Sequence, residues 1–177
     1  DISMIFQDSG AMMNPIRKIG SVFTEYIRTH EKIGKKDAWE KGVEMLERMR
    51  LPDGNNIMKS YPFQLSGGMR QRVGIAMAMT FRPKLLLADE PTSALDVTTQ
   101  AQIVRQMMEL REEYGTSIIM VTHNLGVAAY MGDKVIVMQH GTIMDQGDRE
   151  HVLRSPQSEY TRSLIAAVPT LEGERYV

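Results

Sequence analysis

The amino-acid sequence predicts an α/β fold with a mainly parallel sheet. Three short apolar segments, residues 1–6, 84–88 and 117–122, have the composition of interior strands. A long helical pattern over residues 97–114 lies between the last two, and Gly115 stands where a C-terminal cap is expected. Strand, helix and strand in this order imply parallel strands joined by helical crossovers.

The composition is that of an ordinary globular domain. The 177 residues are 42% hydrophobic and 24% charged, with a net charge of -1. The charge gives no sign of bulk attraction to nucleic acid or anionic lipid, so we expect no nucleic-acid partner. No apolar run approaches the roughly 20 residues that span a bilayer. We therefore expect any membrane to be reached through a partner protein.

The chain contains no cysteine, which excludes disulfides and thiolate-bound metal or iron–sulfur sites and fits a reducing cytoplasm. The first residues, Asp1-Ile-Ser-Met-Ile-Phe-Gln7, resemble a buried strand already under way. We therefore expect the sequence to be part of a longer polypeptide.

The stretch between the first two strands is expected to be mainly helical. Residues 8–20 contain Gly, Asn and Pro and predict a loop. Asp37, with Glu40 three residues on, predicts the start of a helix that ends at Pro52-Asp-Gly-Asn-Asn56. Beyond residue 117, the pattern predicts a short helix at 125–131, a hairpin of 135–138 with 142–145, and a final helix at 158–167.

Two carboxylates, Asp89 and Glu90, directly follow the second predicted strand. In open α/β folds, ligands bind at this carboxyl edge of the sheet. An Asp there can hold Mg²⁺, and a neighbouring Glu can polarise a water for phosphoryl transfer. The alternative is an acidic helix start that only complements the helix dipole, which is equally consistent with these two residues alone.

A polar turn, Ser66-Gly67-Gly68, precedes a helical pattern over residues 69–80. Two glycines allow close backbone approach, and the following helix can present N–H groups to an anion. Taken alone, the simpler interpretation is a helix capped by Ser66. Arg70 and Arg72 are most simply solvated helix side chains.

Other candidates are individually weaker. His123 follows the third predicted strand and Gln7 the first, so both could reach the edge that carries Asp89. A lone His is more often structural, and a Gln is a weak signal. Asp96 has a strong structural explanation as the N-cap of the helix that follows it.

Taken together, these motifs resemble the ATP-binding domain of ABC transporters. Leu65-Ser-Gly-Gly-Met69 is similar to the family signature, and Leu85-Leu-Leu-Ala-Asp89 to the Walker B strand. Gln7 resembles the Q-loop glutamine, Ser93-Ala-Leu-Asp96 the D-loop, and His123 the switch histidine. The five motifs stand in the order that the family requires.

A narrower resemblance points to the oligopeptide/dipeptide importer branch, which includes nickel importers. It rests on Met13-Asn-Pro15, on Gln64 to Arg72, on Leu95 to Ile103 and on the tail Ser155 to Pro169. Members often carry cysteines after this tail for an iron–sulfur cluster. This chain has none, so no cluster is inferred.

The resemblance implies a partial P-loop NTPase (RecA-like) core in residues 1–7 and 81–154. It also implies a helical subdomain with the signature in residues 8–80 and an importer-type extension in residues 155–177. Asp89 and Gln7 would hold Mg²⁺, Glu90 would polarise water and His123 would contact the γ-phosphate of ATP. Ser66, Gly67 and Gly68 would clamp a partner's nucleotide, with Asp96 also at the ATP site.

The implied function is the ATP-binding subunit of an importer of oligopeptide or dipeptide substrates. Its expected partners are a second ATP-binding domain, membrane permease subunits and, indirectly, a substrate-binding protein. The expected location is the inner face of the cell membrane. The alternatives are a nickel importer of the same branch, a soluble ABC ATPase of repair or translation, and a non-hydrolytic module that only lends its signature to a partner.

One family element is not found in the 177 residues, namely the Walker A loop G-x-x-x-x-G-K-[ST]. Its amides and lysine normally supply most of the affinity for phosphate. We therefore expect the 177-residue chain alone to bind ATP weakly or not at all. Calorimetry with millimolar ATP tests this, and tight Mg²⁺-dependent binding would contradict it.

Overall fold

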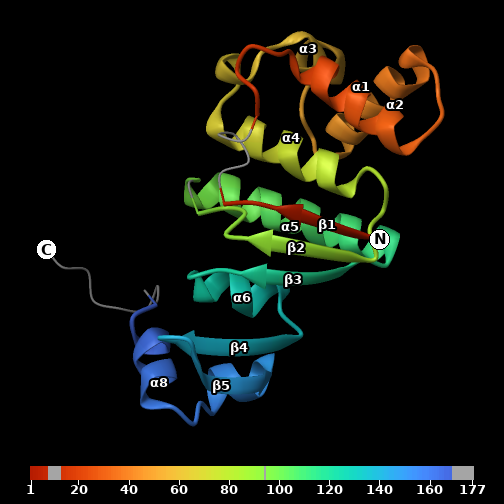
Figure 1. Ribbon diagram of the computed structural model, residues 1–177. Coiled ribbons are helices and arrows are strands. Elements are labelled where there is room, and N and C mark those ends of the chain that lie inside the picture. The colour runs from red at the N-terminus through yellow and green to blue at the C-terminus, as the bar shows by residue number, and fades with distance from the viewer. Residues whose placement is uncertain (8–12, 94, 169–177) are drawn as a thin grey trace, which may run out of the picture. The chain divides into compact units, whose positions relative to one another are not determined.

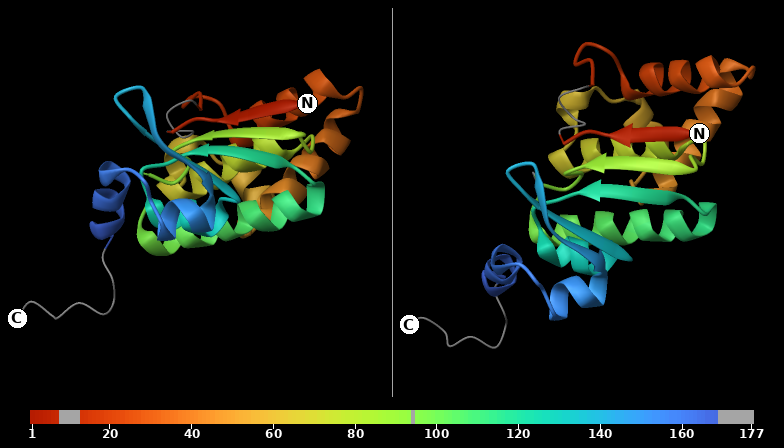
Figure 2. Two further views of the ribbon diagram at one scale, coloured as in Figure 1. Left: turned by 90° about the horizontal axis from the view of Figure 1, so that it is seen from below. Right: turned by 60° about the horizontal axis from the view of Figure 1, so that its bottom comes forward.

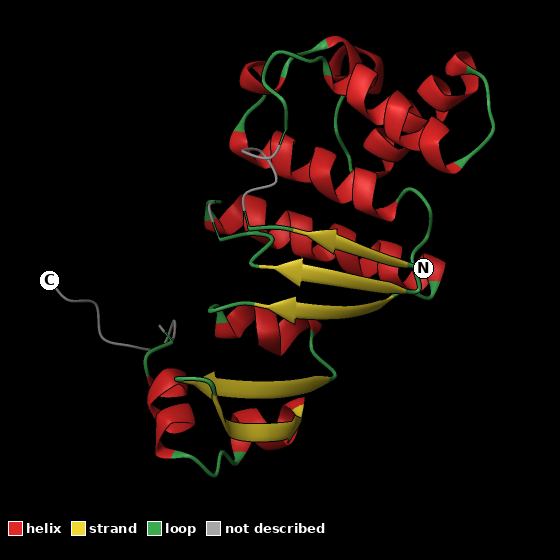
Figure 3. Ribbon diagram, viewed as in Figure 1, coloured by secondary structure: helices red, strands yellow, loops and turns green. Residues whose placement is uncertain are grey.

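The structure, a computed structural model, describes residues 1–7, 13–93 and 95–168. Some residues used in the sequence predictions lie outside the described residues. They are Asp8, Ala94 of the stretch that resembles the D-loop, and residues 169–177 of the expected extension. The described chain divides into two compact units, residues 1–121 and 122–177. Figure 3 colours the helices, strands and loops of both units.

The first unit contains a three-stranded parallel sheet in the order β1-β2-β3. Its strands are β1 (Ile2–Ile5), β2 (Leu85–Asp89) and β3 (Ser117–Val121). Ile5 pairs with Ala88, and Asp89 with Val121, so all three strands end at one edge of the sheet. The prediction of a parallel sheet is confirmed.

The two faces of this sheet are buried to different degrees. Leu86 and Ala88 of β2 are buried, and α5 (Val97–Tyr114) runs along one face of the sheet in Figures 1 and 2. On the alternate positions, Ile119 and Val121 are each 58% exposed. On β2 itself the alternate positions Leu85 and Leu87 are half-buried, so this face is most exposed on the neighbouring strands.

The helices of the first unit gather at and above β1 in Figure 1. The signature helix α4 packs against β1 and α2, and α1, α2 and α3 pack on one another. These elements are α1 (Ile19–His30), α2 (Lys35–Arg48), α3 (Gly54–Lys59), the 3₁₀ turn η1 (Pro62–Gln64) and α4 (Gly67–Met79). Their core is formed by fully buried side chains such as Phe23, Leu46 and Met58.

Two helix starts differ from the prediction. α2 begins at Lys35 after Gly34, and Asp37 lies in its first turn, where its charge still complements the helix dipole. α2 ends at Arg48, before the segment expected to end it. Asp53 of that segment instead starts α3 by accepting a 3.1 Å hydrogen bond from the Asn56 N–H. A short polar cluster with Pro and Gly suits a turn and a helix start equally well.

The second unit has an antiparallel hairpin of β4 (Lys134–Gln139) and β5 (Thr142–Asp148). Its helices are α6 (Leu125–Met131), α7 (Arg149–Arg154) and α8 (Glu159–Ala166). The core consists of Val135, Val137 and Val152 with Tyr160 and Leu164 packed against them. The hairpin, α6 and α8 are confirmed, whereas α7 was not predicted. Within the described chain, no helix has the length and apolarity needed to cross a membrane.

Candidate nucleotide site

The edge where β1 and β2 end brings Gln7 and Glu90 together. The amide Nε2 of Gln7 donates a 3.0 Å hydrogen bond to Oε2 of Glu90, across 83 positions of sequence. Gln7 is exposed and Glu90 is half-buried, so both can be reached from solvent. Parallel pairing of the two strands explains this contact, because it aligns the residues that follow them.

The backbone of Glu90 is also held firmly. Its N–H donates to the carbonyl of Val121 at 2.9 Å, and the N–H and Oγ of Ser93 both donate to its carbonyl, at 3.3 and 3.2 Å. Glu90 has a φ of 42°, a region that non-glycine residues seldom adopt. Strained residues of this kind persist only where the surroundings hold them, and they gather at functional sites.

Asp89 is the last residue of β2 and is half-buried beside Glu90. Its carboxylate and the amide oxygen of Gln7 are hard oxygen donors of the type that Mg²⁺ prefers. The described residues contain no group of three or more acidic or histidine side chains placed to hold a metal. Mg²⁺ is usually bound by one or two carboxylates together with substrate phosphates, so a small donor set is in keeping with this ion.

The signature turn stands at the start of α4. Ser66 is the N-cap, and its Oγ accepts a 3.2 Å hydrogen bond from the Met69 N–H. Ser66 and Gly67 are exposed, while Gly68 is half-buried. The capping interpretation of Ser66 is therefore correct, and the turn is also accessible to a ligand.

The glycines of this turn lie beside the start of α5. A Cβ on Gly68 would lie 2.8 Å from Cγ2 of Thr99, and one on Gly67 would lie 3.9 Å from Cδ2 of Leu95. A side chain at position 68 would therefore clash with Thr99, whereas a Cβ at position 67 would make only an ordinary van der Waals contact with Leu95. Sequence reasoning did not identify Thr99 as a neighbour of the signature, although it lies within the stretch that resembles the importer branch.

Asp96 caps α5, as predicted. Its Oδ1 accepts a 2.9 Å hydrogen bond from the Thr99 N–H, and this bond holds the pKa of Asp96 below its usual value. Because Thr99 also touches the signature glycine, the cap and the signature turn share one residue. The structure therefore links these two motifs locally.

The two arginines of the signature helix are not simply solvated. Arg70 is half-buried and donates to the carbonyl of Leu65, just before the signature turn, at 2.8 Å. Arg72 donates to Oε1 of Gln102 on α5 at 2.8 Å. Burial, followed by the nearby charge of Arg50, lowers the pKa of Arg72. The expectation for both side chains was therefore wrong, because Arg70 bonds the chain just before α4 and Arg72 bonds α5.

His123 belongs to the second unit and is exposed, just before the N-cap of α6. That cap is Asn124, whose Oδ1 accepts hydrogen bonds from the N–H groups of Gly126 and Val127 at 2.9 and 3.3 Å. The role inferred for His123 from its position in the sequence stays a prediction.

Known proteins resemble both the sequence and the fold. Residues 1–93 match the family described as ABC transporter. The oligopeptide transport ATP-binding protein OppD of Salmonella typhimurium is 49% identical over 173 residues, which is 98% of this chain and 52% of that protein. The glutathione import ATP-binding protein GsiA of Escherichia coli is 45% identical over 171 residues, 97% of this chain and 27% of its own length. The chain thus spans about half of OppD.

A solved structure shares the architecture. The ATP-binding cassette MJ0796, in a dimeric post-hydrolysis state bound to ADP and Pi, superposes with a TM-score of 0.73 and 28% identity. The match covers 84% of this chain and 63% of that one. It confirms the predicted α/β fold class. With more than half of its residues matched by the family profile, the chain belongs to the ABC transporter family.

Proposed function

We propose that this chain is part of the ATP-binding subunit of an ABC importer, which couples ATP binding and hydrolysis to uptake. The observation that carries the proposal is the hydrogen bond between Gln7 and Glu90 at the edge where β1 and β2 end. It joins two motifs that are far apart in sequence and that the family resemblance assigns to one catalytic centre. The names of the relatives, which refer to oligopeptide transport and glutathione import, support an importer.

In this proposal, Asp89 and the amide oxygen of Gln7 hold Mg²⁺, which when bound would neutralise charge on the phosphates of ATP. The carboxylate of Glu90 accepts a hydrogen bond from the attacking water and orients it toward the γ-phosphate. His123 contacts the γ-phosphate. The hydrogen bond from Gln7 keeps the Glu90 side chain at the sheet edge, so binding at Gln7 and catalysis at Glu90 are coupled.

The signature turn serves a different nucleotide. Ser66, Gly67 and Gly68 bind the γ-phosphate of ATP held by a second ATP-binding domain, through the exposed start of α4. Asp96 keeps α5 in place beside this turn and borders the ATP site. The dimeric state of the related cassette supports a two-domain arrangement.

The expected partners are a second ATP-binding domain and the permease subunits, with a substrate-binding protein acting through the permease. The subunit would sit at the inner face of the membrane through the permease. Oligopeptides or dipeptides are the proposed cargo, and nickel uptake is the alternative within the same branch. The proposed domain boundaries are unchanged. They are a core in residues 1–7 and 81–154, a helical subdomain in residues 8–80 and an extension in residues 155–177.

A non-hydrolytic module that only lends its signature is the competing function. The full-length protein with Glu90→Gln separates the two, because Gln keeps the size of the side chain and loses the carboxylate. Under the enzyme proposal, ATP hydrolysis falls by about a hundredfold or more, as for removal of a general base. ATP-induced dimerisation, measured by light scattering, persists. Unchanged hydrolysis in this variant would contradict the proposed role of Glu90.

A further inference from the structure

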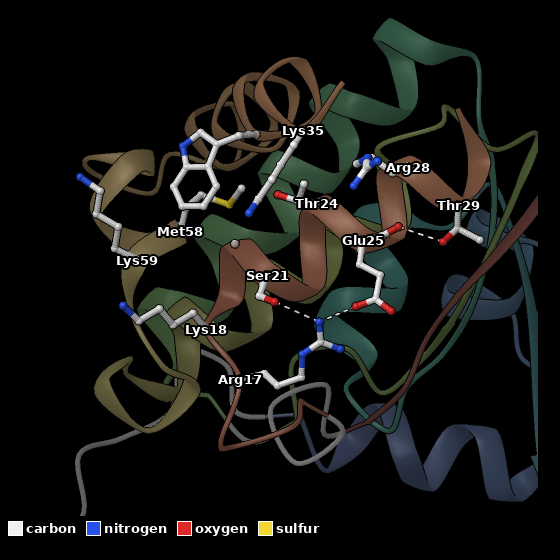
Figure 4. A pocket seen from close by; sticks show the side chains of 12 residues that line it. Arg17, Lys18, Ser21, Thr24, Glu25, Arg28, Thr29, Lys35, Met58 and Lys59 are labelled. Carbon is white, nitrogen blue, oxygen red and sulfur yellow. Dashed lines mark hydrogen bonds and ion pairs between the residues drawn. The ribbon is translucent and has the colours of Figure 1, made fainter. Parts of the chain in front are cut away.

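The helical part of the first unit contains a cavity of about 570 Å³ that the proposed nucleotide site does not use. Its volume falls in the range of pockets for small organic ligands. Figure 4 shows it between α1, the start of α2 and the end of α3. None of the residues that line it belongs to the five motifs of the ABC resemblance.

The lining of the cavity is strongly basic. It carries five cations, Arg17, Lys18, Arg28, Lys35 and Lys59, against the single carboxylate of Glu25. That carboxylate is already paired with Arg17, which also donates to Oγ of Ser21 at 3.0 Å.

Four of these cations lack a counter-charge among the described residues. Within the described parts of the chain, no carboxylate lies within 4.0 Å of Lys18, Arg28, Lys35 or Lys59, and Arg28 donates only to the carbonyl of Ile33. Gathering ammonium groups around one cavity without counter-charges creates a positive potential that attracts an anion.

An apolar wall completes the cavity. Trp39 and Met58 line it together with the charged residues. The indole of Trp39 is fixed because its Nε1 donates to Oδ1 of Asn55 at 2.9 Å. A fixed aromatic ring beside a group of cations suits an anion that carries an organic part.

We propose that this cavity binds a phosphomonoester, with its phosphate near Lys35 and Lys59 and its organic part against Trp39. A phosphate carries nearly two charges and three acceptor oxygens, which match several ammonium groups better than a singly charged carboxylate does. The source is either a free small molecule or the headgroup of a phosphatidic-acid-type lipid. Both present the same chemistry.

Trp39 is the only tryptophan of the chain, so its fluorescence reports occupancy of the cavity directly. The 177-residue chain is titrated with glycerophosphate at constant ionic strength, with glycerol as the uncharged control. A parallel arm uses phosphatidylcholine vesicles with and without phosphatidic acid. A saturable change with glycerophosphate identifies a free ligand, and a change only with phosphatidic acid vesicles identifies a headgroup. No change in either arm overturns the proposal.

Substitutions separate a specific site from diffuse attraction. Lys35→Gln, and separately Lys59→Gln, should weaken binding about tenfold, as expected for loss of one charged hydrogen bond. The matched control is Lys36→Gln, because Lys36 does not line the cavity and lies 3.9 Å from Glu40. Equal weakening by Lys35→Gln and Lys36→Gln would overturn the proposal.

This inference does not depend on the proposed nucleotide site. Lys35 lies outside the residues to which we assign ATP binding, so Lys35→Gln in the full-length protein should leave ATP hydrolysis without phosphomonoester unchanged. The two proposals can therefore fail separately.

Discussion

Gln7 and Glu90 are joined by a 3.0 Å hydrogen bond in which the amide of Gln7 donates to the carboxylate of Glu90. The contact links the end of β1 to the residue after β2. It gives the amide two distinct ends, a nitrogen that holds Glu90 and an oxygen that suits a metal ion. Changes at Gln7 are therefore expected to alter the position of Glu90 as well as Mg²⁺ binding.

Gln7→Ala in the full-length protein should lower ATP hydrolysis by about tenfold or more, because it removes a positioning hydrogen bond and a metal donor. The free energy of unfolding should fall by less than about 1 kcal/mol, since Gln7 is exposed. Steady-state hydrolysis at varied Mg²⁺ and chemical denaturation measure the two effects. Gln146→Ala, at an exposed position of β5, is the control. Equal hydrolysis by the two variants would contradict the assigned role.

Gly68→Ala should destabilise the packing of α4 on α5 by about 1–3 kcal/mol, the usual cost of overpacking. Its Cβ would lie 2.8 Å from Cγ2 of Thr99, a β-branched side chain with little rotamer freedom. Gly67→Ala is the matched control, since its Cβ would meet no described atom closer than 3.9 Å. Denaturant unfolding compares the two variants.

The same clash predicts a rescue. Thr99→Ser removes the methyl group that an alanine at position 68 would meet, so the double variant should recover most of the lost stability. If Thr99→Ser gives no recovery, the contact between these two residues is not the cause of the loss.

Asp145→Asn should destabilise the second unit in a pH-dependent manner. Oδ2 of Asp145 accepts hydrogen bonds from the N–H groups of Ser158 and Gln157, at 3.2 and 2.7 Å. These bonds, that from Ser158 foremost, hold the pKa of Asp145 below the ordinary value of 3.8. A depressed carboxyl pKa stabilises the fold above the unfolded pKa, and this contribution is lost as pH falls through the folded pKa.

The melting temperature of Asp145→Asn should therefore lie a few degrees below that of the parent chain at pH 7, and the two should converge below about pH 3.8. Thermal melts across this range test the prediction. Asp148→Asn is the control, because Asp148 is the N-cap residue of α7 and makes no capping hydrogen bond. A difference that persists unchanged at low pH would show that the charge of Asp145 is not responsible.

The sequence predicted the parts of the fold that depend on local patterns. Gly115 has a φ of 65°, as a left-handed cap requires, and α5 and α6 begin and end at the predicted residues. Asp37 was misplaced because a carboxylate is favourable both as a cap and one turn later. α7 was missed because its six residues are too few to show a periodic apolar face.

The candidate site was predicted only where strand ends indicate it. Because the strands were expected to be parallel, Gln7 and Glu90 were expected at the same edge of the sheet. Their hydrogen bond depends on side-chain rotamers, which the sequence does not reveal. The contact of Gly68 with Thr99 depends on the packing of two helices. The basic cavity has no sequence signature, because its lysines come from the start of α1, the start of α2 and the end of α3.

In the proposed function, the signature turn and the carboxylate pair of one chain serve two different nucleotides. A covalent tandem of two complete ATP-binding domains tests it, with Glu90→Gln and Ser66→Arg placed in opposite halves or in the same half. If Glu90 of one half works with Ser66 of the other, substitutions in opposite halves disable the same site and leave the second site intact. Substitutions in the same half disable both sites. We predict that the tandem with substitutions in opposite halves hydrolyses ATP at about half the parent rate, because the two sites are related by symmetry. The tandem with both substitutions in the same half should hydrolyse no ATP. The reverse pattern would contradict the claim.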